Sequence, residues 1–358
     1  MKIKIKWLIL PIVLLLSACQ FFLGPEPDTS PPEVLKSLWT DFNNIHANLD
    51  LRMSNNSNGY KNWYDVYHNE TTGYALKVNF GMSERDLFFV CAEMINELKD
   101  PHVALFAPGL SLGSYSRRSF NIESVRDMLN GHGNTGFANF VFGKFSSDPD
   151  IGYINILSFE REKAGTKDQE WGKVIDKIVN SLADTKALVL DVRYNGGGDV
   201  YITEYIAARF ASVSKDYLKA RVKTGPGKND LSAPIIYTVK SISKASGNQY
   251  SYTKPIVLMT NEYSVSAAEW FTMALRTQSH VTHAGERTCG AFSSRKDRYM
   301  INGWLYTISP ERVTDMNDKI YEGIGISPEC IIPSNSTDAA DIQQLESAIK
   351  LAVKLAGG

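Results

Sequence analysis

The sequence predicts an α/β fold, because apolar runs of strand length alternate with segments of helical periodicity between residues 151 and 333. Residues 187–192 and 255–260 are mostly apolar, which is typical of strands buried on both faces of a parallel sheet. Residues 171–182 carry apolar side chains at the spacing of one helix face. We therefore expect an α/β core over residues 151–333, built as a sheet flanked by helices.

A small helical domain is expected before this core, over residues 33–107. Its clearest element begins at Ser83, because Ser83 to Asp86 resembles a capping box, an arrangement that starts many helices. Apolar side chains then recur every three or four residues and share one helix face: Leu87, Cys91, Met94 and Leu98.

The remaining elements follow the same two patterns. Strands are predicted at residues 151–157, 187–192, 235–239, 255–260 and 281–284. Helices are predicted at residues 171–182, at 201–210, from 266 onward and at 339–355. Residues 108–150 are expected to connect the helical domain to the core, and residues 334–358 to form a C-terminal helix.

Composition and charge narrow the classes of function. The chain has 358 residues, of which 43% are hydrophobic, enough to build a large core. The net charge of −1 gives no electrostatic reason to expect nucleic-acid binding. No Cys-x-x-Cys or His-x-x-x-His spacing occurs, so neither a metal nor another cofactor is predicted.

Residues 1–18 have the pattern of a bacterial lipoprotein signal peptide. Three lysines precede an apolar run from Trp7 to Leu16, which is too short to span a bilayer as a helix. The run leads into Ser17-Ala18-Cys19, which resembles the end of a lipobox. We expect lipidation of Cys19, a tether over residues 19–32 and anchoring to the bacterial outer membrane, facing the periplasm or the surface. A plain secretory signal peptide is the alternative.

The cysteines after Cys19 are expected to be free thiols within the fold. Cys91 lies on the apolar face of the helix that begins at Ser83. A disulfide between Cys289 and Cys330 is the alternative for the other two, because the sequence does not give the distance between their Cα atoms.

Ser266 has the sequence setting of a nucleophile. It lies where the strand at residues 255–260 is followed by an apolar helical pattern, so its hydroxyl is at the positive end of a helix. Acyl-transfer enzymes place a nucleophilic serine in such a position. The alternative is that Ser266 only caps the helix, since serine is a favoured N-cap residue.

A glycine-rich turn follows the strand at residues 187–192. Its three consecutive glycines, Gly196 to Gly198, let backbone N–H groups converge on an anion. The spacing matches neither of the glycine motifs that bind nucleotide phosphates, whereas an oxyanion hole needs the same convergence. Plain turn chemistry is the alternative.

Of the six histidines, His102 has the best setting for a general base. It follows the helix that begins at Ser83, at a turn stiffened by Pro101. An imidazole exchanges protons near neutral pH, as proton transfer from a serine requires. A structural or solvated histidine is the alternative.

Together these segments resemble a family of serine peptidases that includes the bacterial C-terminal processing (tail-specific) peptidases, the tricorn protease core and the repeats of interphotoreceptor retinoid-binding protein. Five motifs match in family order between residues 98 and 332. They are Asp100 to Val103, Asp191 to Gly198, Ser266 to Glu269, Gly285 to Gly290, and Glu322 to Glu329.

The resemblance implies a ClpP/crotonase-like α/β core and the chemistry of acyl transfer. It implies Ser266 as the nucleophile and His102 as its base. It also implies that the backbone N–H groups of Gly197 and Ala267 form the oxyanion hole.

Two departures from the tail-specific members refine this expectation. Those members carry a catalytic lysine at the position of Ala291, and Lys296 lies five residues too late to match. A tricorn-like arrangement with a histidine base is therefore favoured over a Ser-Lys dyad. Residues 108–150 are also too few for the PDZ domain that those members carry.

The support of His102 departs from the tricorn-type members as well. Pro101 replaces a serine that precedes the histidine in those members. Glu322 is the expected third member of the site, orienting the imidazole, and Asp100 is the rival partner.

The predicted function is that of a secreted, lipid-anchored serine endopeptidase that cleaves peptides or unfolded proteins. The alternative is a catalytically inactive protein that binds peptides or lipophilic ligands, because the retinoid-binding relatives show that the scaffold hosts binding without proteolysis. A glycan-binding lipoprotein is a third hypothesis, which depends on the lipobox alone. Neither the cleavage specificity nor the oligomeric state is predicted.

Overall fold

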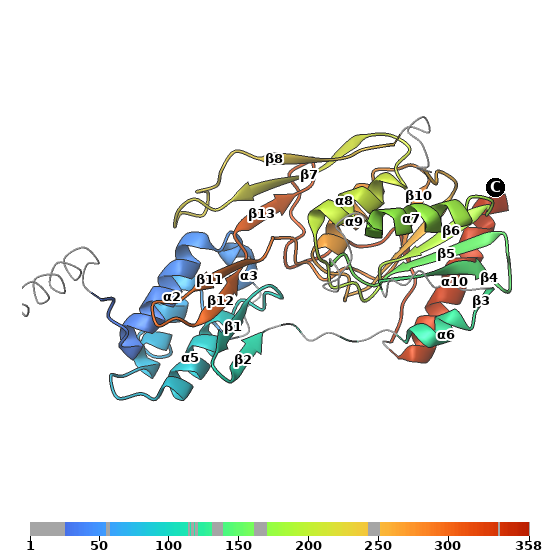
Figure 1. Ribbon diagram of the computed structural model, residues 1–358. Coiled ribbons are helices and arrows are strands. Elements are labelled where there is room, and N and C mark those ends of the chain that lie inside the picture. Colours follow the sequence, from blue (N-terminus) through green and yellow to red (C-terminus); the bar gives the residue numbers. More distant parts are fainter. Residues whose placement is uncertain are drawn as a thin grey trace, which may run out of the picture.

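The computed structural model describes residues 26–54, 58–113, 115, 118, 121–130, 139–160, 170–242, 251–335 and 337–357. The expected signal peptide and Cys19 lie outside these residues. Figure 1 shows a helical N-terminal lobe, a larger core lobe built around a sheet, and a smaller sheet above the junction between them. No helix within the described ranges combines the length and apolar character that crossing a bilayer requires.

The N-terminal lobe is built from short helices, as the sequence predicts. They are α2 (Pro31–Ile45), α3 (Leu49–Met53), α4 (Trp63–His68), the 3-10 helix η2 (Tyr74–Lys77) and α5 (Glu84–Asn96). The Ser83 hydroxyl caps α5 by accepting the N–H of Asp86 at 3.1 Å, which confirms the predicted start. The predicted apolar face is buried in this lobe: Leu87, Cys91, Met94 and Leu98.

A four-stranded sheet completes the N-terminal lobe, in the order β11-β12-β1-β2. The strands are β1 (Ala104–Ala107), β2 (Leu110–Gly113), β11 (Lys296–Tyr299) and β12 (Leu305–Ile308). The β11–β12 hairpin falls within the range predicted for the core. It packs on the N-terminal lobe instead, because its apolar side chains join the hydrophobic core there: Trp304, Tyr306 and Ile308.

The core lobe contains a seven-stranded sheet in the order β14-β10-β9-β6-β5-β4-β3. The strands are β3 (Leu129–Asn130), β4 (Phe140–Phe145), β5 (Ile151–Ile156), β6 (Ala187–Asp191), β9 (Ile256–Thr260), β10 (Val281–Gly285) and β14 (Cys330–Ile331). Neighbouring strands from β14 to β5 pair in parallel, whereas β4 and β3 pair antiparallel. The predicted α/β core is confirmed, and the sheet extends into β3 and β4, within the region expected only to connect the lobes.

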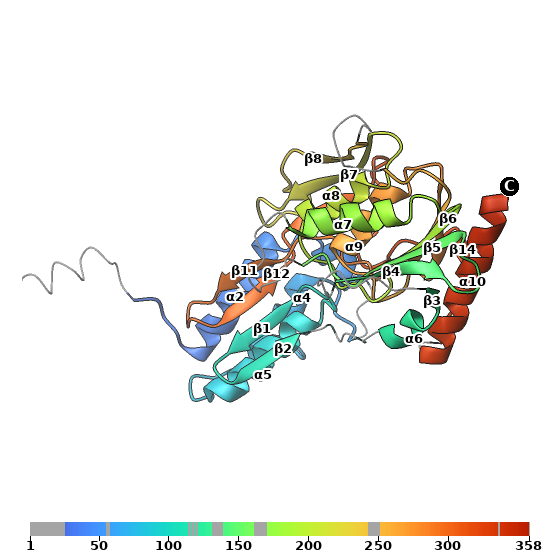
Figure 2. The same ribbon diagram turned by 45° about the vertical axis from the view of Figure 1, so that its right-hand side comes forward.

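Helices cover both faces of this sheet (Figures 1 and 2). One face packs against α7 (Glu170–Ser181), α8 (Val200–Ala208) and α9 (Ala267–Leu275) through side chains such as Leu188 and Leu190. The other packs against α6 (Ile122–Arg126) and α10 (Asp338–Gly357) through Ala187 and Val189. Because strand side chains alternate between faces, the continuous apolar strands build two separate hydrophobic layers.

A three-stranded antiparallel sheet lies outside the core sheet, in the order β13-β7-β8. Its strands are β7 (Lys215–Val222), β8 (Ile235–Val239) and β13 (Glu311–Thr314). The strand predicted at residues 235–239 therefore forms, but it pairs with β7 rather than with the parallel core strands.

The topology brings two loops together at one edge of the core sheet. Strands β6 and β9 are parallel neighbours, so the loops that follow them leave from the same end. The loop after β6 contains the three glycines, and the loop after β9 contains Ser266. Chain segments far apart in sequence thus meet where the core lobe faces the N-terminal lobe.

Candidate active site

Ser266 lies at a strained turn between β9 and α9. Its backbone has φ 59° and ψ −120°, a conformation rare for a residue with a side chain. The neighbouring glycine loop holds this turn: Val265 N–H donates to the carbonyl of Asn195 at 3.0 Å. The Ser264 hydroxyl also donates to the carbonyl of Val192 at 2.8 Å. The turn places Ser266 at the N-cap of α9, as predicted.

The buried carboxylate of Glu269 braces the same turn. It accepts hydrogen bonds from the backbone N–H groups of Ser266 at 3.2 Å, Gly290 at 2.7 Å and Ala291 at 2.7 Å. It also accepts the Thr288 hydroxyl at 2.6 Å. Burial raises the pKa of Glu269 to about 7, against the effect of these donors. Glu269 thus joins the first turn of α9 to the loop that follows β10.

The glycine loop fits tightly against Ser266. A Cβ atom at Gly197, where φ is +95°, would lie 2.7 Å from the Cβ of Ser266. A Cβ atom at Gly198, where φ is +143°, would lie 2.2 Å from the backbone of Phe159. Only glycine combines these dihedral angles with such close approach. The side chain of Asn195 fixes the loop by donating to the Ile156 carbonyl at 2.8 Å.

Gly197 and Ala267, the two predicted oxyanion donors, differ in their surroundings. The N–H of Gly197 donates to the side-chain oxygen of Asn195 at 2.9 Å, so a turn within the loop engages this donor. Gly197 therefore supports Ser266 from behind, while Gly196 and Gly198 line the cavity beside it. Ala267, the other predicted donor, is the first residue of α9 and also lines the cavity.

His102 lies in the turn between α5 and β1. Its backbone N–H donates to the carboxylate of Asp100 at 2.9 Å, and its carbonyl accepts the Thr307 hydroxyl of β12 at 2.6 Å. The imidazole Nδ1 is buried and has no hydrogen-bond partner. Burial lowers the pKa of His102, while the Asp100 and Glu322 carboxylates raise it and Arg52 lowers it. The neutral form, which can accept a proton, is therefore favoured.

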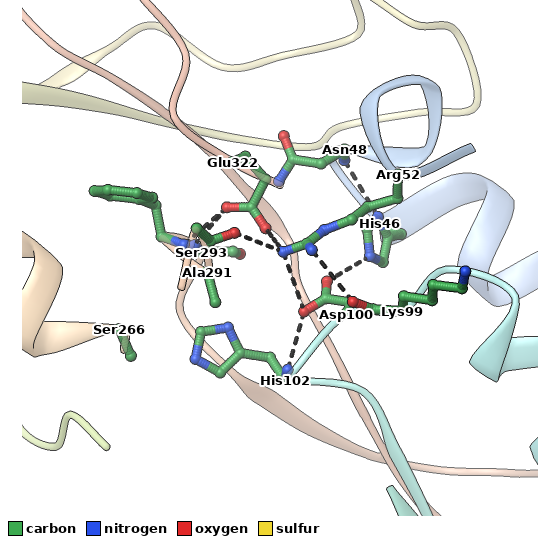
Figure 3. Close-up of polar contacts among 12 residues, drawn as sticks. His46, Asn48, Arg52, Lys99, Asp100, His102, Ser266, Ala291, Ser293 and Glu322 are labelled. Carbon is green, nitrogen blue, oxygen red and sulfur yellow. Dashed lines mark hydrogen bonds and ion pairs between the residues drawn. The ribbon is translucent and has the colours of Figure 1, made fainter. Parts of the chain in front are cut away.

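Ser266 and His102 line one cavity of about 530 Å³ between the two lobes. In Figure 3 one imidazole nitrogen is on the side that faces Ser266. Among the residues drawn there, no hydrogen bond joins the two side chains. The cavity wall is formed by Pro101, His102, Val103, Ala104, Gly113, Tyr115, Glu160, Gly196, Gly198, Val200, Val265, Ser266, Ala267, Trp270, Phe292, Ser293, Ser294 and Arg295.

Neither predicted partner of His102 makes a hydrogen bond to its buried Nδ1 in the described structure. Glu322 is buried and pairs with Arg52, and it accepts the backbone N–H of Phe292 at 2.8 Å. Asp100, the rival partner, is fully buried. Sequence patterns did not identify Arg52, because one arginine in a short helix carries no periodic or motif signal.

The lysine of a Ser-Lys dyad has no counterpart among the described cavity residues. Ala291 is fully buried at that position. Lys296 is exposed on β11 and does not line the cavity. The cation in the cavity wall is Arg295.

Asp191 and Arg193 lie beneath the site rather than in it. Their buried side chains form an ion pair of 2.7 Å, and Arg193 also donates to the Gln344 side chain of α10 at 2.8 Å. Cys91, Cys289 and Cys330 are free thiols, so the alternative disulfide is absent. Within the described ranges, no cluster of His, Cys, Asp and Glu side chains could hold a metal ion.

Comparison with known proteins agrees with this geometry. Residues 150–332 match the sequence profile of peptidase family S41. The carboxy-terminal processing protease CtpA of Bacillus subtilis is 30% identical over 143 residues, which span 40% of this chain and 26% of that protein. A candidate peptidase from Parabacteroides merdae superimposes with a TM-score of 0.75 at 23% identity, covering 91% of this chain and 97% of that one. The tricorn protease gives a TM-score of 0.55 at 14% identity, over 91% of this chain and 37% of that one.

Proposed function

The chain belongs to peptidase family S41, and we propose that it hydrolyses peptide bonds through an acyl-enzyme on Ser266, with His102 as the general base. The observation that carries this proposal is that both side chains line the same cavity. They come from different lobes, and the strained turn at Ser266 presents its side chain to that cavity.

The reaction follows from these positions. Neutral His102 accepts the proton of the Ser266 hydroxyl, and the serine oxygen attacks the substrate carbonyl carbon. The proposed donors to the oxyanion are the N–H of Ala267 and backbone N–H groups of the glycine loop, whose Gly196 and Gly198 line the same cavity. When the carbon–nitrogen bond breaks, the His102 imidazolium gives its proton to the leaving amine. His102 then activates a water molecule, which hydrolyses the acyl-enzyme.

A histidine base is proposed in preference to a lysine base. Ala291 supplies no amine, and the nearby Lys296 is exposed outside the cavity. No hydrogen bond joins His102 and Ser266 in Figure 3, and catalytic hydrogen bonds of this kind often shorten only when substrate binds. The remaining wall combines apolar side chains with two serines and with the charged Glu160 and Arg295, a surface suited to peptides or unfolded proteins.

Peptide hydrolysis by three variants tests this proposal. Ser266→Ala and His102→Ala are each expected to lower kcat by about 10³–10⁶-fold, because the two groups act as a unit. Ser294→Ala is the matched control, since Ser294 lines the same cavity without a proposed role and should retain activity. Equal activity of wild type and Ser266→Ala contradicts the proposal. Peptide binding without hydrolysis by the wild type supports the inactive binding protein instead.

We propose further that the enzyme is attached to the bacterial outer membrane through a lipid on Cys19. The lipobox-like sequence supports this location. Replacing Cys19 with alanine is expected to move the protein from the membrane fraction to the soluble fraction and to abolish incorporation of a labelled fatty acid. Unchanged labelling of Cys19→Ala contradicts lipidation at this residue.

A further inference from the structure

A buried cluster of charged groups lies next to His102 (Figure 3). Arg52 of α3 forms an ion pair with Glu322 and lies 3.7 Å from the carboxylate of Asp100. It also donates to the carbonyl of Gly290 at 2.9 Å and to that of Lys99 at 3.3 Å. Arg52, Asp100 and Glu322 are together called the charge cluster below.

The hydrogen bonds define the charge of this cluster. His46 lies beside it, and its Nδ1 accepts the backbone N–H of Asn48 at 3.2 Å. The Nε2 of His46 therefore carries a proton, which it donates to Asp100 at 2.9 Å. Arg52 and His46 hold the pKa of Asp100 below its ordinary value despite its burial. With Glu322 paired to Arg52, two carboxylates and one guanidinium leave one net negative charge.

His102 needs such a counter-charge. Its Nδ1 is buried without a partner, and an imidazolium that forms during proton transfer would be costly at this position. The charged groups that act on it are Asp100 from its own loop, Arg52 from α3, and Glu322 and Arg295 from the core segments. Of these, only the charge cluster carries net negative charge.

We propose that Arg52 is a positioning residue for His102, which holds Asp100 and Glu322 together as one buried counter-charge for the imidazolium. This inference rests on the proposed role of His102 as the base. In this arrangement no single carboxylate needs to bond to the imidazole. Arg52 instead holds both carboxylates beside it. Arg52 does not line the cavity, so it acts through its neighbours rather than on substrate.

An arginine suits this role better than a lysine. The planar guanidinium reaches Glu322, Gly290 and Lys99 simultaneously, and these groups belong to both lobes. A lysine ammonium is a single point charge and cannot span the same acceptors in one fixed geometry. The Arg52→Lys variant should therefore preserve the charge of the cluster but loosen its geometry.

Removing either partner of the ion pair should shift the pKa of His102, in opposite directions for Arg52 and Glu322. Arg52→Gln removes a nearby positive charge, so the pKa of His102 should rise by about one unit. Glu322→Gln removes a nearby negative charge, so the pKa of His102 should fall by about one unit. Arg52→Lys should leave the pKa near its wild-type value while kcat falls about tenfold and KM changes little.

The direct test is an NMR titration of the His102 ring proton, assigned by its loss in His102→Ala. Arg209→Gln is the matched control, because Arg209 is buried and forms an ion pair of 2.7 Å with the partly buried Asp176, and neither residue lines the cavity. Opposite shifts in Arg52→Gln and Glu322→Gln, with no shift in the control, support the inference. Shifts in the same direction, or none in either variant, overturn it. If Arg52→Gln does not fold, Glu322→Gln and Arg52→Lys decide: a lowered and an unchanged pKa support the inference, and any other pair overturns it.

The titration does not require hydrolysis, so the two proposals fail separately. If the two variants shift the pKa of His102 in opposite directions but the wild type hydrolyses no peptide, the proposed function is contradicted. The proposed role of the charge cluster is then still supported. Hydrolysis that depends on Ser266 without those shifts supports the function and overturns the role of Arg52. In an active enzyme, the acid limb of kcat/KM should move with the measured pKa of His102 in each variant.

Discussion

Replacing Gly197 with alanine should damage catalysis more than stability. Gly197 lies directly behind the proposed nucleophile, and an added Cβ would meet the Cβ of Ser266 at 2.7 Å. It would also meet the Val265 carbonyl oxygen at 2.9 Å and the Ala267 nitrogen at 3.1 Å. All three contacts belong to the turn that holds Ser266, so the strain falls on the nucleophile.

The size of the effect follows from two separate costs. Ordinary contact begins at 3.4 Å, so the two Cβ atoms must move apart by about 0.7 Å. A displacement approaching 1 Å costs about 10²-fold in rate when it affects a reacting group. The positive φ of 95° adds about 1–2 kcal/mol of backbone strain to the folded state.

Gly303→Ala separates these costs. Gly303 has a similar φ of 84°, but a Cβ there would have no atom within 4 Å. Both variants should lose about 1–2 kcal/mol of unfolding free energy from the backbone alone. Only Gly197→Ala should lower kcat/KM on a peptide substrate by about 10²-fold. Equal kcat/KM for the two folded variants would refute the tight support of Ser266 by the glycine loop.

Three further outcomes are expected. Glu269→Gln should lower the free energy of unfolding in urea by about 2–6 kcal/mol, because the amide nitrogen cannot accept and leaves two of the four donors unpaired. A loss below about 1 kcal/mol would contradict the bracing of the turn by Glu269. Arg193→Met should lower the free energy of unfolding by about 3–5 kcal/mol, because the buried Asp191 loses its ion-pair partner. An unchanged free energy of unfolding would show that this ion pair does not anchor α10. The wild-type kcat/KM should decline on the acid side with a midpoint below about pH 6.5, because burial lowers the pKa of His102 and the protonated imidazole cannot accept the serine proton. A midpoint above about pH 7.5 would point to another base.

The core of the fold could be predicted because its signals are local. Strands β6 and β9 are continuous apolar runs, and the cap of α5 is set by residues three positions apart. Local sequence could not predict the lobe on which the β11–β12 hairpin packs. Its apolar side chains show that it needs a hydrophobic surface, but only the folded structure shows that this surface is the N-terminal lobe.

Some residues of the candidate site could also be predicted from local sequence, whereas others could not. Ser266 and the three glycines are recognisable because each lies at a strand end within a motif of the family. The hydrogen bond from Gly197 to Asn195 and the burial of Asp100 depend on loop conformation and on packing between lobes. Arg52 and His46 belong to segments with no motif of their own, and they meet Asp100 only in the folded chain.

Covalent labelling shows whether His102 activates Ser266. The wild-type protein, treated with a fluorophosphonate that phosphonylates activated serines, is expected to gain one adduct, located at Ser266 by fragment mass spectrometry. His102→Ala should label at least about 10²-fold more slowly, because the serine then lacks its base. Labelling of another serine, or equal labelling rates in wild type and His102→Ala, would contradict a histidine-activated nucleophile at Ser266.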